Sequence, residues 1–231
     1  MLEFPIASVD SVLCLGAHCD DIEIGAGATI LKLVAAQPSV RVHWIVFSAT
    51  EIRAAEARAS AGDFLAAAGS VDLQIKTFSD GFFPSEGAAL KRCFEELKAD
   101  VAPDLVLTHY REDRHQDHRV ISDLTWNTFR DHLVLEYEVP KFDGDLGHPN
   151  CFVPVDDGPR AFKVDTILRR YASQGAKEWF TGETFNALMR LRGLECRSRT
   201  GYAEAFHARK FVAVPDNQSR PVDRASVMPP G

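Results

Sequence analysis

Short apolar runs and longer helical patterns alternate along the first two-thirds of the chain. Continuous apolar runs are typical of strands buried on both faces, whereas helical spacing places the apolar residues on one side of a helix. The alternation therefore predicts an α/β fold with a mostly parallel sheet and helices on both faces. The predicted strands are 11–17, 40–48, 73–78, 104–109 and 133–139, and the predicted helices are 24–36, 51–68, 87–98 and 117–132.

The pattern changes beyond Lys141. Residues 141–158 are rich in glycine, proline and aspartate, which predicts a loop that is longer than a simple connection needs. We therefore expect this loop to belong to the active site. Two helices at 159–174 and 183–192 and a strand at 203–213 are predicted to follow. We expect residues 1–214 to form a single domain and residues 215–231 to be a mobile tail.

Composition and charge narrow the classes of function. The chain has 231 residues, 45% of them hydrophobic, and a formal net charge of −7, which suits a globular protein and argues against nucleic-acid binding. No apolar segment is long enough to span a membrane and the N-terminus lacks signal-peptide features, so we expect a cytoplasmic protein. The five cysteines include no CxxC pair, which argues against a disulfide framework and a thiolate zinc site.

Two polar clusters follow predicted strands. The stretch GAHCDDIEIGAG (16–27) follows the first strand, and HYREDRHQDH (109–118) follows the fourth. Ligands of parallel sheets bind beyond the carboxyl ends of the strands, so we expect the two clusters to meet at one edge. His18, Asp21 and His118 then supply two imidazoles and one carboxylate, a donor set typical of catalytic zinc sites. Donor sets of this type also accept Fe²⁺.

The same clusters contain candidates for proton transfer. Asp20 could take a proton from metal-activated water, and His115 could stabilise an oxyanion or protonate a leaving amine. Asp117 could orient an imidazole. Each motif alone has a structural alternative, because aspartate is favoured at helix N-termini and the second cluster could be a solvated helix start. A metal- or sugar-binding module without catalysis is a further alternative, although binding alone does not require a base.

The segments AHCDDIEIGAG and DRHQDHR, in this order and spacing, resemble the two motifs of the LmbE-like or PIG-L-type zinc-dependent N-deacetylases. The resemblance implies a Rossmann-like fold and hydrolysis of an N-acetyl group from an amino sugar or its conjugate, with release of acetate. An amidase acting on a larger acyl or thiol conjugate is the alternative enzyme. The long loop and the family are also consistent with a homo-oligomer. The positions that match the family's zinc ligands are His18, Asp21 and His118, and those that match its base, its oxyanion-stabilising histidine and the partner of that histidine are Asp20, His115 and Asp117.

Several positions depart from the family motifs or have no assigned role. Cys19 and Gln116 stand where the family usually has proline, and FSATE (47–51) stands where it often has a Thr-Asp-Gly turn. A thiolate is a strong zinc ligand, but Cys19 should point away from Asp20, so we expect it not to bind the metal. The favoured interpretations of the remaining residues are a structural role for Glu23, a solvated helix face for Arg53, packing for His109, and either substrate or solvent contact for His148.

Overall fold

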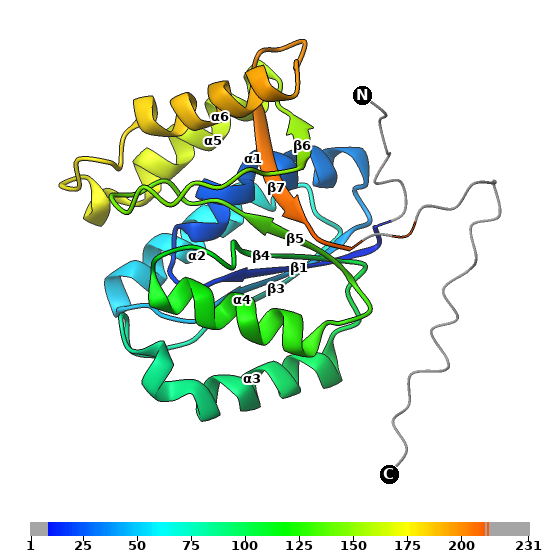
Figure 1. The fold of residues 1–231 in the computed structure, drawn as a ribbon, viewed down its shortest axis with the longest axis vertical. Coiled ribbons are helices and arrows are strands. Elements are labelled where there is room, and N and C mark those ends of the chain that lie inside the picture. The colour runs from blue at the N-terminus through cyan, green and yellow to red at the C-terminus, as the bar shows by residue number, and fades with distance from the viewer. Residues whose placement is uncertain (1–8, 211, 213–231) are drawn as a thin grey trace.

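In the residues that the structure describes, 9–210 and 212, seven strands form one sheet (Figure 1). The structure is a computed structural model. The strands are β1 (Ser11–Gly16), β2 (Arg41–Val46), β3 (Ser70–Ile75), β4 (Leu105–His109), β5 (Leu133–Tyr137), β6 (Cys151–Pro154) and β7 (Ala203–Ala208). Their order across the sheet is β3-β2-β1-β4-β5-β7-β6. The first five of these are parallel, and β7 is antiparallel to both of its neighbours.

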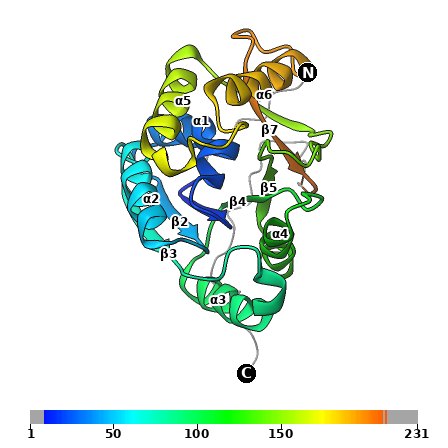
Figure 2. The same cartoon turned by 90° about the vertical axis from the view of Figure 1, so that its left-hand side faces the viewer.

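Helices cover both faces of this sheet (Figures 1 and 2). They are α1 (Asp21–Ala36), α2 (Glu51–Phe64), α3 (Gly87–Asp100), α4 (Gln116–Thr128), α5 (Asp157–Arg170) and α6 (Gly182–Glu195), with short 3₁₀ helices η1 (Phe83–Glu86) and η2 (Ala172–Gln174). Buried side chains of α1, α2, α5 and α6 pack on one face, and those of α3, α4 and η1 pack on the other. The predicted α/β fold with a mostly parallel, doubly covered sheet is confirmed.

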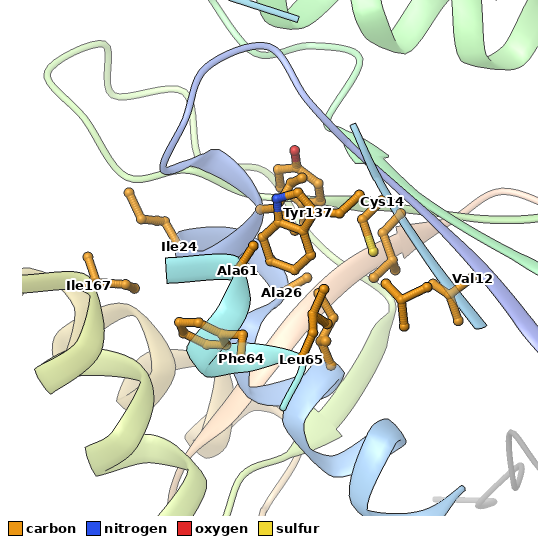
Figure 3. Close-up of a cluster of buried hydrophobic side chains, with 14 of the residues drawn as sticks. Val12, Cys14, Ile24, Ala26, Ala61, Phe64, Leu65, Tyr137 and Ile167 are labelled. Atoms are coloured by element: carbon orange, nitrogen blue, oxygen red, sulfur yellow. The ribbon is translucent and has the colours of Figure 1, made fainter. Parts of the chain in front are cut away.

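The continuous apolar run of β1 is explained by this double covering. Val12 and Cys14 belong to the core cluster on the α1 side (Figure 3), whereas Leu13 and Leu15 belong to the cluster on the α3 side. All four side chains are fully buried. Burying one such aliphatic side chain contributes roughly 1.5–3 kcal/mol, so a polar substitution in the middle of either face would be destabilising.

The strand order creates a crevice at the carboxyl ends of β1 and β4. The chain proceeds from β1 to β2 and β3 in one direction and then returns to place β4 on the other side of β1. Connections that leave two adjacent parallel strands in opposite directions open a crevice between them, where ligands bind in folds of this kind. The segments that follow β1 and β4 are those of the two predicted polar clusters, so both clusters lie at this crevice.

Some predicted boundaries differ from the structure. The third strand is Ser70–Ile75 instead of 73–78, because it pairs with β2 from Ser70 onward and its edge position tolerates polar residues. The segment 141–158 is not a loop throughout, since it contains the edge strand β6, which pairs with β7. A short edge strand among glycines and prolines has a weak sequence signal. The strand predicted at 203–213 ends at Ala208, and the tail 215–231 lies outside the described residues.

None of the helices in the described part of the chain is long and apolar enough to cross a membrane.

Candidate active site

The turn between β1 and α1 carries the first cluster. The helix begins at Asp21, earlier than predicted, and the Asp21 carboxylate accepts a hydrogen bond from the backbone N–H of His18 at 2.6 Å. An acidic residue is favoured at this position because the N-terminus of a helix carries partial positive charge. The turn therefore brings the side chains of His18 and Asp21 together, with Nδ1 and Oδ2 3.3 Å apart.

The second cluster lies at the start of α4. His115 is the N-cap residue, and its Nδ1 accepts a hydrogen bond from the backbone N–H of Asp117 at 3.3 Å. His118 lies in the first turn, and its ring stacks on that of His115 with centroids 4.7 Å apart. The ring centroids of His115 and His118 lie 4.8 and 5.2 Å from that of His18. The helix start thus presents both imidazoles to the β1–α1 turn.

The three predicted metal ligands meet across the crevice. Nδ1 of His18 lies 3.2 Å from Nε2 of His118, and Oδ1 of Asp21 lies 3.5 Å from the same nitrogen. Donor atoms around a tetrahedral zinc ion with bonds of about 2.0–2.1 Å are roughly 3.3–3.4 Å apart. The two imidazole nitrogens are spaced as such an ion requires, whereas the Asp21 carboxylate faces them through different oxygens, Oδ2 at 3.3 Å from His18 and Oδ1 at 3.5 Å from His118. His18 and His118 also form a metal-capable group with His115. A donor set of two imidazoles and one carboxylate also suits Fe²⁺.

His109 supports this site from the end of β4. It is fully buried, its Nε2 accepts a hydrogen bond from the backbone N–H of Ala17 at 2.9 Å, and its ring stacks on His118 at 3.9 Å. Together with Asp21 and His118 it forms one of the groups of side chains that could hold a metal. The predicted packing role agrees with its burial, and the Ala17 contact shows that it also braces the β1–α1 turn.

Asp80 is a site residue that the sequence reasoning missed. Its Oδ1 lies 3.0 Å from Nε2 of His18, and it joins His18, His115 and Asp117 in a second metal-capable group. Unlike the other members, Asp80 is largely exposed. It stands in a loop after β3, where the sequence offers no motif beyond a single aspartate before a glycine.

Asp113, which is itself paired with Lys141, contacts Nδ1 of His118. Oδ2 of Asp113 lies 2.9 Å from Nδ1 of His118 and 2.9 Å from Nζ of Lys141. Although burial opposes ionisation, His118 and Lys141 hold the pKa of Asp113 below its usual range. A carboxylate behind a metal-binding imidazole fixes the ring and its tautomer, with the other nitrogen left free for the metal. The sequence reasoning missed both residues, although Asp113 lies within the second cluster.

Asp20 is buried beside Arg53. Their side chains form an ion pair of 2.7 Å, and that of Arg53 is 18% exposed. The expectation of a solvated helix face for Arg53 is wrong, because the start of α2 packs over the β1–α1 turn and turns this side chain inward. Burial raises the pKa of Asp20 although the charge of Arg53 opposes the rise.

The Asp117 carboxylate has partners other than the predicted one. It accepts hydrogen bonds from the backbone N–H groups of Gly81 at 2.6 Å and Phe83 at 3.1 Å, and its Oδ2 lies 3.3 Å from Nε2 of His18. Its contact with His115 is made through the backbone N–H instead. In the structure, the carboxylate therefore orients His18 and ties the loop after β3 to α4.

The two positions that replace the family's prolines have distinct surroundings. Cys19 is buried, its thiol donates to the carbonyl of Ser48 at 3.6 Å, and burial raises its pKa to about 12. A thiol held protonated and bonded elsewhere is a poor metal ligand, as expected. The side-chain amide of Gln116 donates to the carbonyl of Gly81 at 3.0 Å and so adds to the link between α4 and the loop after β3.

Glu23 has the structural surroundings that we expected. It is fully buried, and its carboxyl group accepts hydrogen bonds from the hydroxyls of Ser60 and Tyr171. The Tyr171 hydroxyl also donates to the carbonyl of Cys19. Burial raises the pKa of Glu23 to about 8. These contacts join α2 and the end of α5 to the first turn of α1.

The pKa values of the site histidines shift in different directions. Although burial opposes the rise, hydrogen bonds with Asp117 and Asp21 raise the pKa of His18 well above its usual range. Burial, followed by the neighbouring His109, lowers the pKa of His118 to about 4, so this ring is neutral near pH 7 and free to bind a metal. Burial and the adjacent His18 also lower the pKa of His115. Because Nδ1 of His115 accepts the Asp117 N–H, the neutral ring carries its proton on Nε2.

A pocket of about 160 Å³ opens above these side chains. Its wall includes Arg53, Asp80, Lys141, Lys177 and Trp179 beside the residues of both clusters. Lys141 is the only residue of the 141–158 segment in this wall, as far as the described residues show. His148 lines a separate cleft with Tyr110 and several arginines. The active-site role of this segment stays a prediction that rests on Lys141.

A family model described as PIG-L, GlcNAc-PI de-N-acetylase, matches residues 13–129, about half of the chain. The chain belongs to the PIG-L family. The matched range contains both polar clusters, and the resemblance of the two sequence motifs to this family is confirmed. No curated protein gives a significant match to the sequence.

Solved structures show the same fold at low sequence identity. An N,N'-diacetylchitobiose deacetylase from Pyrococcus horikoshii is 19% identical, with a TM-score of 0.67 over 89% of this chain and 85% of its own. A zinc-inhibited form of teicoplanin deacetylase is 16% identical, with a TM-score of 0.64 over 85% and 96%. GalB, a 4-carboxy-2-hydroxymuconate hydratase from Pseudomonas putida, is 18% identical, with a TM-score of 0.71 over 90% and 99%. At such identities the likeness establishes the fold, and the reaction has to be argued from the site.

Proposed function

We propose that the protein is a metal-dependent hydrolase that removes an N-acetyl group from an amino sugar or an amino-sugar conjugate and releases acetate. The observation that carries the proposal is the meeting of donor atoms from His18, Asp21 and His118 at 3.2–3.5 Å beside the buried carboxylate of Asp20. Membership of the PIG-L family and a fold shared with two deacetylases support it. The three residues would hold zinc or Fe²⁺.

A metal bound there supplies Lewis acidity, which lowers the pKa of water and polarises an acyl carbonyl. Asp20 then accepts the proton that water loses as it attacks the acetyl carbon. Burial raises the pKa of Asp20 towards neutral pH, where a general base is most effective. The guanidinium group of Arg53 holds the Asp20 carboxylate in one orientation.

His115 acts on the other side of the reacting carbonyl. Its Nε2–H donates to the negative charge that develops on the carbonyl oxygen, because Nδ1 is already engaged by the Asp117 backbone. The C–N bond breaks as the sugar nitrogen takes up the proton that Asp20 accepted from water, so the products are acetate and a free amine. Asp117 holds His18, and Asp113 with Lys141 holds His118, which keeps the donor atoms in place.

Other reactions remain candidates because the fold alone does not select one. A neighbour with this fold was solved as a hydratase, and an amidase on a larger acyl or thiol conjugate would use the same groups. The third alternative, a binding module without catalysis, does not require a base. The burial of Asp20 beside the proposed ligands therefore argues against it. Identification of both products therefore has to accompany any test of activity.

The test is a screen of N-acetylated sugars and their nucleotide and lipid conjugates, with acetate and free amine measured separately. We expect equal amounts of the two products, loss of both after treatment with a chelator, and recovery after addition of zinc or Fe²⁺. Asp20→Asn serves as the inactive control, because the amide keeps the shape of the side chain but cannot take the proton. Product formation that survives both the chelator and this substitution would contradict the proposal.

A further inference from the structure

A buried ion pair outside the pocket binds the backbone of α1. Nζ of Lys163 in α5 lies 2.6 Å from Oε1 of Glu204 in β7, and the two residues are 2% and 3% exposed. The ammonium group also donates to the carbonyl of Ile24 at 2.7 Å. The carboxylate accepts the backbone N–H groups of Ala28 at 2.8 Å and Thr29 at 2.7 Å.

These contacts fall where the first turn of α1 joins the rest of the helix. In a regular α-helix the N–H of residue 28 faces the carbonyl of residue 24. At this level of α1, which is continuous from Asp21 to Ala36, the Glu204 carboxylate also binds the amides as an acidic side chain does at the start of a helix, and the Lys163 ammonium group also binds the Ile24 carbonyl as a basic side chain does at a helix end. The pair therefore holds the backbone of α1 from both sides at the end of its first turn.

The packing at this junction leaves no room for a side chain at Gly25 or Gly27. A Cβ on Gly25 would lie 2.2 Å from the ring of Tyr137, and one on Gly27 would lie 2.7 Å from the ring of Phe64. Figure 3 shows Tyr137 and Phe64 among the buried side chains around Ile24 and Ala26. The backbone of α1 thus lies directly against its neighbours here, so a small shift of the junction moves the whole first turn.

Stability alone is a weak reason for such a pair. Removing two charges from water costs several kcal/mol, and well-packed apolar residues of similar volume are often as stabilising as a buried ion pair or more so. What an apolar pair cannot do is bind two amides and a carbonyl of the helix at defined positions. The ion pair therefore determines where the first turn lies more than it determines how stable the fold is.

The geometry points to Lys163 and Glu204 as positioning residues, which place the first turn of α1 and with it Asp20 and Asp21. This inference rests on the proposed function, because it assigns what the pair does for that same site. Both residues lie outside the range 13–129 that matches the family model. Neither residue lines the pocket above the two clusters, so they act on the site through the helix backbone.

The test replaces the pair by neutral side chains of similar volume, Lys163→Met together with Glu204→Gln. We expect a folded protein with cooperative unfolding, zinc binding weaker by on the order of 10- to 100-fold in competition with a chelator, and a similar loss of kcat. KM should change much less, because the pair touches no part of the pocket. Zinc affinity is measured without substrate, so it does not depend on knowing the reaction.

The control is the similarly buried pair of Arg192 and Glu138, in which Nη2 of the arginine donates to Oε1 of the glutamate at 2.7 Å. This pair binds the backbone of Gly147 instead of that of α1. Arg192→Met together with Glu138→Gln should lower the melting temperature comparably and leave zinc affinity at the wild-type value. If the Lys163/Glu204 variant matches this control in zinc affinity and kcat, the pair is only structural and the inference is overturned.

A more conservative variant keeps the test decisive if the double substitution does not fold. Lys163→Arg retains the charge but places a larger group against the Ile24 carbonyl, so it should fold and bind zinc several-fold more weakly. Wild-type zinc affinity in this variant would overturn the inference while the proposed function stands. A wild-type protein that binds neither zinc nor Fe²⁺ would overturn the proposed function, and the inference with it.

Discussion

The region before β5 and the region from β5 onward contribute to the candidate site in different ways. The earlier region carries all six predicted ligands and catalytic residues, together with Asp80 and Arg53. The later region contributes Lys141, Lys177 and Trp179 to the pocket wall, and otherwise holds the earlier region in place through Tyr171 and the Lys163–Glu204 pair. One region supplies the reactive groups and the other determines where they lie.

The charges of the two regions differ accordingly. In the later region, the buried ions are closed pairs, such as Lys163 with Glu204 and Arg192 with Glu138. At the crevice, His115 and His118 have ring centroids 4.8 and 5.2 Å from that of His18, and the rings of His109 and His118 lie 3.9 Å apart. The adjacent Asp20 and Asp21 are buried beside them. Closed pairs can position a backbone but cannot take up protons or metals, whereas the crevice holds several adjacent imidazoles and carboxylates that can do both.

The largest effect should come from loss of a metal ligand in the earlier region. His118→Ala removes the imidazole that both Asp21 and His18 face, so we expect bound metal and activity to be lost together. Elemental analysis of the purified variant beside wild type checks this. His148→Ala, in the separate cleft, is the matched control and should keep its metal. Equal metal content in all three proteins would contradict the assignment of His118.

Asp20→Asn separates the role of the base from that of the metal ligands within the earlier region. The amide is nearly the same shape, so the metal should stay, while kcat falls on the order of 10²- to 10⁴-fold because the proton of water has no acceptor. Metal content and kcat are measured on the same preparation. A variant with near-normal kcat would exclude Asp20 as the base.

His115→Ala distinguishes an enzyme from a binding module. Loss of one donor to an oxyanion typically costs on the order of 10²- to 10³-fold in kcat, and KM should change far less since the contact forms mainly in the transition state. Metal content, kcat and KM together check this outcome. Lost metal would make His115 a ligand, and unchanged kcat would remove it from the mechanism.

Glu23→Gln should have the smallest effect on activity, since Glu23 does not line the pocket, and its main effect concerns stability. The pKa of Glu23 is raised from its ordinary value near 4.5 to about 8, so between these values the unfolded chain is ionised there while the folded protein is protonated. Stability contributed by this group is therefore lost as pH rises through that window, at a slope approaching about 1.4 kcal/mol per pH unit. Chemical denaturation should show that the free energy of unfolding falls less between pH 5 and pH 8 in the variant than in wild type. An equal fall in both proteins would contradict the shifted pKa.

Sequence patterns were most informative where they depend on local neighbours. The continuous apolar runs of β1 and β4 predicted buried strands, and the side chains that follow them identified the residues that meet at the crevice. The pattern misplaced the bounds of β3 and missed β6, because an edge strand is held by backbone pairing with one neighbour and needs little apolar sequence. It also left open which partner each charged residue would find.

The amino-acid sequence alone predicted the α/β fold class, the strands that end at the site and the chemistry of the side chains placed there. The pairing of Arg53 with Asp20, the contacts of Asp113 and Lys141 around His118, and the binding of Lys163 and Glu204 to the backbone of α1 became visible only in three dimensions. Hydrophobic periodicity indicates which face of an element is buried, because it depends on residues that are close in the sequence. The partner of a charged residue cannot be predicted in this way, because it depends on how elements distant in the sequence pack together.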